Sequence, residues 1–336
     1  MNFWLKVLLV LLFFLLLTII LTVNYIDGYR YITINSNNIF QLDREYSYKP
    51  KIKNTIISLT TIPNRLKHIK PILMSLLDSS VRVEEIRLNI PYKSCKGIKY
   101  VIPKWLTKLK FVKIYRTEKD WGPATKLLPT LLDCFRGKYK NGVNTKIIVV
   151  DDDVIYGYYM VETINDYFEK YNHPQKRMAD SNEYNYPQKY NLYSNEYHSN
   201  HRKVAITMYG DKIDEKDRMK YDFSTRTNNY LKGDKYTDVL RGHAAYMVTP
   251  SMFTKEIFKY DSHPAECFFV DDNYFSAQLK LNNVRILMTG INYKAVPLPE
   301  NFNGGIDALH QTHNENGKNE VIVNKHFNKL YHLRKP

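Results

Sequence analysis

The sequence predicts an α/β domain built on an open mixed sheet flanked by helices, with one transmembrane helix before it. Three observations support this fold class. From residue 54 onward, short β-branched runs alternate with segments of helical periodicity. The run 146–150 is a buried-strand pattern that leads into three consecutive aspartates. The stretch Val7–Ile26 contains no charged residue and is dominated by Leu, Val, Phe and Ile.

The N-terminal stretch has the length of a membrane anchor. Twenty helical residues rise about 30 Å, roughly the thickness of the bilayer's hydrocarbon core. Lys6 precedes the stretch, which predicts a cytoplasmic tip and a single-pass type II topology within residues 1–26. The rest would lie on the lumenal or exoplasmic side, in a secretory, viral or bacterial membrane. A cleaved signal peptide is the alternative, although its apolar region is usually shorter, about 7–15 residues.

The domain boundaries follow from composition and periodicity. Residues 27–52 are polar and aperiodic, which predicts a stem, and residues 53–320 form the expected main domain. Within that domain, residues 173–202 are rich in Tyr, Asn and Ser, which predicts a polar loop insertion. Residues 321–336 are expected to be a tail. The elements expected in chain order are strand 54–60, helix 65–77, strands 85–90 and 110–115, helix 125–135, strand 146–150, helix 158–171, strands 204–209 and 246–248, helix 272–281 and strand 284–288.

Charge and cysteine content narrow the function classes only slightly. The chain has 49 Lys and Arg against 34 Asp and Glu, a net charge of +15. Because the lysines look scattered and accompany many Asn, Ile and Tyr residues, we take this charge as weak support for an anionic ligand, and no nucleic-acid partner is expected. Cys95, Cys134 and Cys267 are far apart and form no C-x-x-C pair, so neither a zinc site nor a dense disulfide scaffold is expected.

The aspartates after the strand 146–150 are the main chemical signal. Three adjacent carboxylates repel one another, and a cation would relieve that repulsion. Asp151 and Asp153 are two residues apart, so in extended backbone they point to the same side. Hard divalent cations prefer such oxygen ligands. The pattern therefore predicts a metal site at the carboxyl end of a strand, and an acidic turn that caps the next helix is the alternative.

Five segments in this order resemble the nucleotide-sugar-dependent glycosyltransferases of the GT-A type, whose hallmark is a D-x-D motif at a strand end. The segments are Ile57–Pro63, Asp120–Lys126, Asp151–Asp153, Arg241–Ala245 and Val270–Asn273. The resemblance implies a Rossmann-like nucleotide-binding half joined to an acceptor half. It also implies transfer of a sugar from a nucleotide-diphosphate sugar, with a UDP-sugar favoured, to an acceptor hydroxyl on a glycan, glycoprotein or glycolipid.

The resemblance also assigns the donor site and its cofactor. Mn²⁺ or Mg²⁺ would be held by Asp153, with Asp151 and one late histidine, His310 or His313. For Asp120 a turn or helix-capping role remains open, for Lys126 a solvated position, and for the histidines a surface position. The residues implied to contact the donor are Thr60, Thr61, Arg65, Asp120, Lys126, Asp151 and Asp152.

The acidic pair Asp271–Asp272 is implied to accept the proton from the acceptor hydroxyl in an inverting reaction. The family usually has Glu-Asp at this place, and the alignment of the pair favours Asp272 as the base. Retention of configuration and a helix-capping role for the pair remain open. Gly242, His243 and Trp121 would contact the acceptor or the sugar, while Tyr246 and Trp121 are aromatic side chains that would stack on a ring or belong to the core.

Three other functions fit parts of the pattern. A metal-dependent phosphodiesterase or nuclease would use the same acidic cluster and the positive charge. A glycoside hydrolase would use two carboxylates without a metal. A catalytically inactive, membrane-tethered sugar-binding protein would retain the site without turnover. The identities of the sugar and the acceptor, the disulfide state and the oligomeric state are left open by the sequence.

Overall fold

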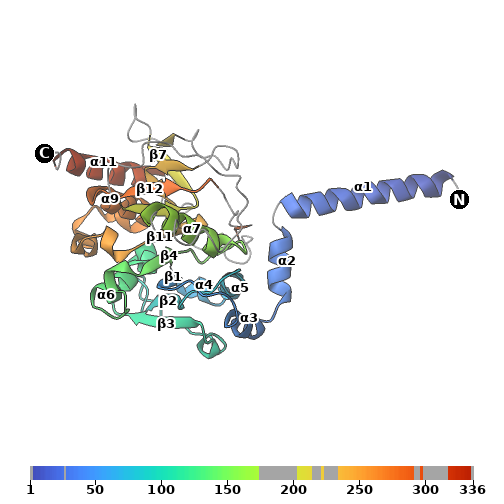
Figure 1. The fold of residues 1–336 in the computed structure, drawn as a ribbon, viewed down its shortest axis with the longest axis horizontal. Helices are drawn as coiled ribbons and strands as arrows, with labels where there is room; N and C mark the ends of the chain where they lie inside the picture. Colours follow the sequence, from blue (N-terminus) through green and yellow to red (C-terminus); the bar gives the residue numbers. More distant parts are fainter. Residues whose placement is uncertain are drawn as a thin grey trace.

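A computed structural model describes residues 3–25, 28–173, 203–213, 221–222, 234–290, 296–297 and 317–333. Its centre is an eight-stranded mixed sheet of order β3-β2-β1-β4-β11-β6-β12-β9, with helices on both sides (Figure 1). The predicted α/β architecture is therefore confirmed. Residues 174–202, which make up the rest of the expected loop insertion after His173, lie outside the described residues.

One half of the sheet is parallel and carries the first acidic motif. It consists of β1 (Thr55–Thr60), β2 (Ile86–Pro91), β3 (Val112–Thr117) and β4 (Lys146–Val149). The register pairs β1 with β2 on one side and with β4 on the other, all in parallel. Because every residue of β4 is buried, its apolar run forms a central strand rather than an edge. The carboxyl ends of β1 and β4 therefore lie at the same edge of the sheet.

The other half of the sheet changes direction next to β4. β11 (Tyr246–Val248) runs antiparallel to β4 and to β6 (Val204–Thr207). β12 (Arg285–Met288) is parallel to β6. β9 (Lys235–Thr237) pairs antiparallel with β12 and is the edge strand on this side. Two small sheets accompany it: β10 (Val239–Leu240), β7 (Gly210–Ile213) and β8 (Tyr221–Asp222) form one, and β5 (Val154–Ile155) and β13 (Val296–Pro297) form the other.

Proline shortens two of the predicted helices. The expected helix 65–77 is split into α4 (Pro63–Leu66) and α5 (Lys70–Leu77), because Pro71 lacks an N–H and its ring clashes with the carbonyl four residues earlier. The expected helix 125–135 begins as the 3₁₀ turn η2 (Gly122–Lys126) and continues as α6 (Leu128–Phe135). Two further helices pack on the sheet, α7 (Met160–Asn172) and α9 (Asp271–Leu281).

The expected stem is helical. α2 (Gly28–Ser36) and α3 (Ile39–Tyr46) lie between the N-terminal helix and the first strand, and Ile39, Leu42 and Tyr46 of α3 are buried in the core. The Asp43 carboxylate accepts hydrogen bonds from the backbone N–H groups of Lys110 and Phe111, at 2.8 and 3.0 Å. Buried apolar contacts on one face of α3 thus outweigh the low overall hydropathy that suggested an irregular stem.

The N-terminal stretch forms α1 (Phe3–Tyr25), which extends away from the domain in Figure 1. Most of its apolar side chains from Trp4 to Leu17 are exposed. In the part of the chain that the structure describes, no helix reaches the combination of length and apolarity needed to cross a membrane, so the predicted transmembrane anchor finds no support.

At the other end of the chain, α11 (Lys318–Leu333) replaces the expected tail. Val323 and Phe327 are buried, and α11 packs against α9 and against the 3₁₀ segment η10 (Ala265–Phe269). This helix therefore supports the segment that carries Asp271 and Asp272 from behind.

Candidate active site

The two acidic motifs meet at one edge of the sheet. Asp151 follows β4 at the carboxyl end of the parallel half, and Asp271 and Asp272 form the first turn of α9. Between them lies Lys126, the last residue of η2. Its ammonium Nζ is 2.8 Å from Asp151 Oδ1, 3.0 Å from Asp271 Oδ2 and 3.6 Å from Asp272 Oδ1. Lys126 is 4% exposed, so this one cation holds three carboxylates together in a buried site.

The charges in this cluster shift one another's pKa values. Burial alone would lower the pKa of Lys126, but Asp151, Asp271 and Asp272 outweigh it and raise that pKa well above its ordinary value. For Asp151, burial opposes ionisation, yet the adjacent ammonium prevails and lowers the pKa. Asp271 behaves differently: burial, with the neighbouring Asp272 and Asp151, overcomes the ammonium and raises its pKa to about 7. A carboxyl group with a pKa near neutrality is suited to general-base chemistry.

Arg65 organises the rest of the acidic strand end. Its Nη1 is 2.9 Å from Asp152 Oδ1 and 3.1 Å from Asp153 Oδ2. Asp152 also accepts a hydrogen bond from the Thr61 hydroxyl. Burial and the charges of Asp152 and Asp151 raise the pKa of Asp153 to about 7, despite Arg65. Both carboxylate oxygens of Asp152 therefore have partners from the segment after β1. For Asp153, the single contact with Arg65 does not compensate for burial and for the two neighbouring carboxylates.

Gly242 lies against the centre of the Lys126 cluster. Its N–H donates to Asp272 Oδ2 at 2.9 Å. A Cβ atom at this position would lie 2.6 Å from Lys126 Nζ and 3.1 Å from an oxygen each of Asp151 and Asp272. Three residues later, Ala245 has φ 83°, a backbone conformation that non-glycine residues rarely adopt. The segment 241–245 is therefore shaped to bring backbone close to the charged cluster.

Three buried polar atoms at this place make no hydrogen bond within the described residues. They are the Tyr246 hydroxyl, Asp271 Oδ2 and Asp272 Oδ1. The two carboxylate oxygens have Lys126 at ion-pair distance but outside hydrogen-bond geometry. Tyr246 begins β11 opposite Val149 of β4. Since buried polar groups usually have partners, this convergence indicates a place for a ligand atom or water.

Several predicted donor residues have structural partners instead of open positions. Asp120 Oδ2 accepts the N–H of Cys95 at 2.7 Å, and Oδ1 accepts the N–H of Gly122 at 2.8 Å. This geometry fits the alternative interpretation of Asp120 as a turn residue. The Thr60 hydroxyl donates to the Asn89 carbonyl at 2.8 Å, away from the aspartates.

The predicted acceptor contacts are divided. Gly242 lies in the cluster, and His243 is exposed beside it, with its ring centroid 5.1 Å from that of Tyr209. Trp121 is half-buried against the core. His310 and His313 lie outside the described residues. Among the residues that the structure describes, no group of three or more His, Cys, Asp or Glu side chains is placed to hold a metal ion.

Two supporting residues escaped the sequence analysis. Tyr156 is fully buried, and its hydroxyl accepts the N–H of Asp151 at 2.7 Å, which fixes the backbone of the acidic strand end. Arg241 donates to Asp211 Oδ2 at 2.6 Å and to Glu320 Oε1 at 3.1 Å, so it ties β7 to α11. Arg241 belongs to the segment Arg241–Ala245 of the resemblance, which could have drawn attention to it. No motif in the neighbouring sequence indicates a role for Tyr156.

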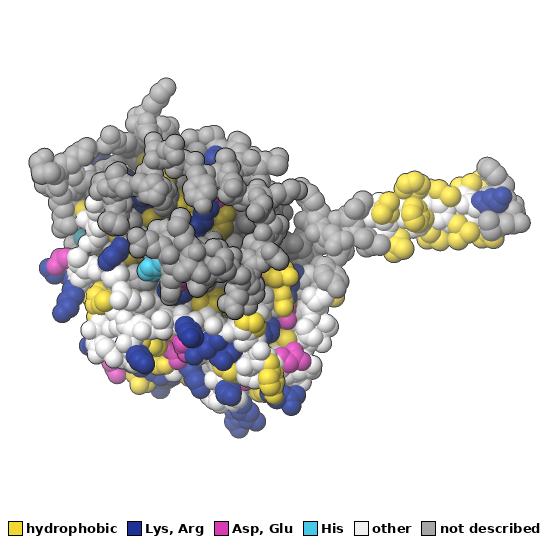
Figure 2. All heavy atoms as spheres, in the orientation of Figure 1, with side chains coloured by type: hydrophobic (Ala, Val, Ile, Leu, Met, Phe, Trp, Pro, Cys, Tyr) yellow, Lys and Arg dark blue, Asp and Glu magenta, His cyan; other side chains and the backbone are white. Residues whose placement is uncertain are grey.

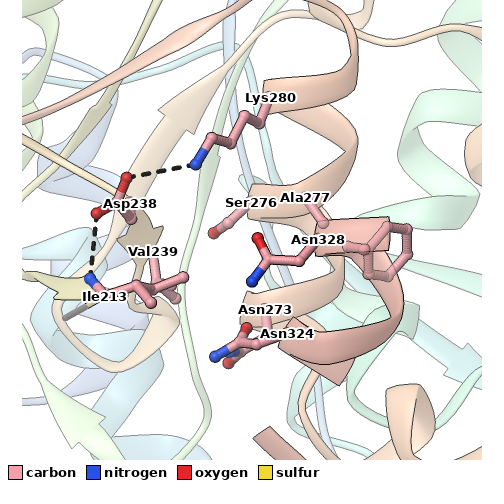
Figure 3. Close-up of a pocket in the computed structure, with 10 residues that line it drawn as sticks. Ile213, Asp238, Val239, Asn273, Ser276, Ala277, Lys280, Asn324 and Asn328 are labelled. Atoms are coloured by element: carbon pink, nitrogen blue, oxygen red, sulfur yellow. Dashed lines mark hydrogen bonds and ion pairs between the residues drawn. The ribbon is translucent and has the colours of Figure 1, made fainter. Parts of the chain in front are cut away.

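A shallow groove with a volume of about 20 Å³ lies along α9 (Figure 3). Apolar side chains and amides line it, and Asn273 Nδ2 donates to Asn324 Oδ1 at 3.0 Å. At its rim Lys280 lies 3.6 Å from Asp238. Because Asn273 directly follows Asp272, the groove adjoins the Lys126 cluster through the backbone of α9.

No protein-family model matches this chain, and no curated protein matches it. Among solved structures, it is similar to residues 1–349 of Staphylococcus aureus TarS, a glycosyltransferase, at 11% identity and a TM-score of 0.38. The match covers 85% of this chain and 72% of that one. A likeness at this level carries no argument about the present chain.

Proposed function

We propose that this protein is a glycosyltransferase that moves a sugar from a nucleotide-diphosphate sugar, with a UDP-sugar favoured, to an acceptor hydroxyl. The main observation in support is the position of the Lys126 ammonium, which lies between Asp151 at the strand end and the acidic pair of α9. Two of the five segments on which the sequence resemblance rested, Asp151–Asp153 and Val270–Asn273, therefore belong to one site. A glycan, glycoprotein or glycolipid would supply the acceptor hydroxyl.

In this proposal the cationic side chains serve the donor. Lys126 and Arg65 are the two positive groups at the strand ends, and a diphosphate would draw on both. Thr61 and Tyr156 hold Asp152 and Asp151 in place, so the donor meets a preorganised site. The absence of a side chain at Gly242 leaves room for Lys126 and the sugar to approach the backbone.

The acidic pair of α9 would take the proton from the acceptor hydroxyl as that oxygen attacks the anomeric carbon. Asp271 has a pKa of about 7, and Asp272 is oriented by the Gly242 N–H. Since both carboxylates surround one ammonium, the proton is assigned to the pair. The sequence favoured Asp272 as the general base, and this assignment stays a prediction. The raised pKa of Asp271 supports a shared role for Asp271 in taking up the proton. Deprotonation opposite the leaving diphosphate corresponds to the inverting reaction.

Carboxylate oxygens at the strand end are ligands of the chemical kind that a hard divalent cation prefers. Three aspartates follow the strand, and two more belong to α9; within the described residues these five carboxylates are paired with Lys126 and Arg65. Asp153, with Asp151 beside it, would hold Mn²⁺ or Mg²⁺, and His310 remains a proposed additional ligand. When bound, such an ion would neutralise charge on the departing diphosphate.

The test is a screen of nucleotide sugars for metal-dependent release of the nucleoside diphosphate. The full chain would be compared with Asp153→Ala and Asp272→Asn, and with Asp261→Asn as a control at an exposed aspartate outside the site. We expect release from one donor that EDTA and both site variants abolish and the control retains. No turnover with any donor, together with no thermal shift from UDP or GDP in the presence of Mn²⁺, would refute the proposal.

A further inference from the structure

A second feature lies away from the acidic site, in the connection between β2 and β3. From Lys93 to Thr117 the chain carries seven lysines and one arginine and no Asp or Glu. The lysines of the chain are therefore not evenly scattered, since this segment is locally rich in them. The seven are all exposed: Lys93, Lys96, Lys99, Lys104, Lys108, Lys110 and Lys113.

These lysines lie along one edge of the molecule. β3 is the outermost strand on its side of the sheet, and the connection before it includes the turn η1 (Leu106–Lys108). Figure 2 shows Lys and Arg side chains gathered at the lower end of the molecule, where Figure 1 places β3. We call residues 93–113 the basic edge.

The charges of the basic edge are not neutralised by the described part of the chain. None of its seven lysines forms an ion pair there. Asp43, the acid of α3 that contacts this segment, is occupied by the backbone N–H groups of Lys110 and Phe111. Glu85 of the neighbouring β2 region accepts from the Tyr115 hydroxyl at 2.9 Å. The ammonium groups consequently remain available to an external anion.

Large apolar side chains stand among these lysines. Val101 is 84% exposed, Tyr92 51% and Ile98 45%, and Trp105 is half-buried. Ile98 follows Gly97 in a tight loop closed by the bond from the Ser94 N–H to the Ile98 carbonyl, at 2.9 Å. A polyanion in solution gains little from exposed aliphatic side chains. A lipid surface accommodates both the apolar side chains and the lysines. Aliphatic and aromatic groups enter the headgroup region, while the lysines contact anionic headgroups.

We propose that the basic edge binds the surface of a membrane that contains anionic lipids. Bound in this way, the β3 end of the domain faces the lipid headgroups, and the loop tip at Ile98 and Val101 contacts the acyl boundary. The interaction uses none of the residues of the acidic cluster.

The experiment compares the full chain on phosphatidylcholine vesicles and on mixed phosphatidylcholine–phosphatidylglycerol vesicles. Any contribution of α1 is common to both, so the gain caused by the anionic lipid is the quantity of interest. The test variant replaces Lys96, Lys99, Lys104 and Lys108 by Gln. The matched control replaces four exposed lysines elsewhere by Gln: Lys53, Lys67, Lys140 and Lys255.

We expect the anionic lipid to raise the partition coefficient of the wild type, and each lysine removed from the basic edge to lower that gain about fivefold. The control variant should keep most of the gain. Backbone hydrogen exchange gives a local readout: residues 93–113 should exchange more slowly on the mixed vesicles only. Equal loss in the two variants, no gain with phosphatidylglycerol, or unchanged exchange in 93–113 would each overturn the proposal. Protection by soluble polyphosphate but not by vesicles would assign the edge to a polyanion instead.

Discussion

Replacing Lys126 by Met removes the positive charge on which three buried carboxylates depend. Met has a similar length and no charge, so the packing volume is largely kept while Asp151, Asp271 and Asp272 lose their common partner. Removing one member of a buried ion pair typically costs about 3–5 kcal/mol, because the remaining charge stays buried. For a domain of this size each kcal/mol lowers Tm by about 2–4 °C, so the expected decrease is about 6–20 °C.

The size of this decrease should depend on pH. Without the ammonium, burial raises the folded-state pKa of Asp151 above its unfolded value of about 3.9 and raises the pKa of Asp271 further. A carboxyl group with a raised folded pKa costs little stability when protonated and costs more as pH rises toward that pKa. The Tm difference between wild type and Lys126→Met should therefore be smaller at about pH 5 than at about pH 8.

Thermal unfolding followed by circular dichroism at the two pH values measures this effect, with Lys140→Met as the exposed-lysine control. Adding Asp271→Asn to Lys126→Met should restore part of the lost stability, because one uncompensated charge is then absent. A decrease no larger than that of the control, or one that is the same at both pH values, would show that Lys126 does not neutralise the carboxylates.

Three further predictions concern the same site. Gly242→Ala places a methyl group 2.6 Å from Lys126 Nζ and should destabilise the fold by about 1–3 kcal/mol, measured by urea unfolding; an unchanged midpoint would contradict the close approach. Tyr246→Phe removes a buried hydroxyl that makes no hydrogen bond to the residues that the structure describes, so stability in the unliganded state should be unchanged or higher while donor turnover falls. Parallel losses of stability and turnover would mean that the hydroxyl serves the fold. Release of the nucleoside diphosphate should rise with pH through about 7 as Asp271 loses its proton, and Asp271→Asn should remove that limb of the pH profile.

The backbone pattern of the sheet was predictable because its strands are continuous apolar runs. The predicted strand 146–150 corresponds to β4 with one residue less, and 246–248 coincides with β11. The helix 65–77 was wrong in its interior, since periodicity continued across Pro71 and gave that residue too little weight. The helices within the expected stem were not predicted, because short helices such as α3 depend on partners distant in sequence, here the residues after Leu109.

The site was predictable as a set of motifs but not as an arrangement. Asp151 and Asp271 were each visible as acids at the end of an element. That Lys126 would lie between them depends on how η2, β4 and α9 meet, and no local pattern encodes such a meeting. The clustering of lysines in the basic edge was visible in the sequence, but the compositional bias of the whole chain concealed it until their exposure was known.

The Asp120 carboxylate has a mechanical consequence. One of its oxygens holds the backbone of Cys95 in the surface loop, and the other holds Gly122 at the start of η2, the turn that ends at Lys126. The Asp120 side chain therefore connects the outer loop to the turn that ends at the buried ammonium of Lys126. A displacement of the loop must either break the hydrogen bond from Cys95 to Asp120 or move η2 as well. A movement of η2 would change the position of Lys126 relative to the three carboxylates that surround it.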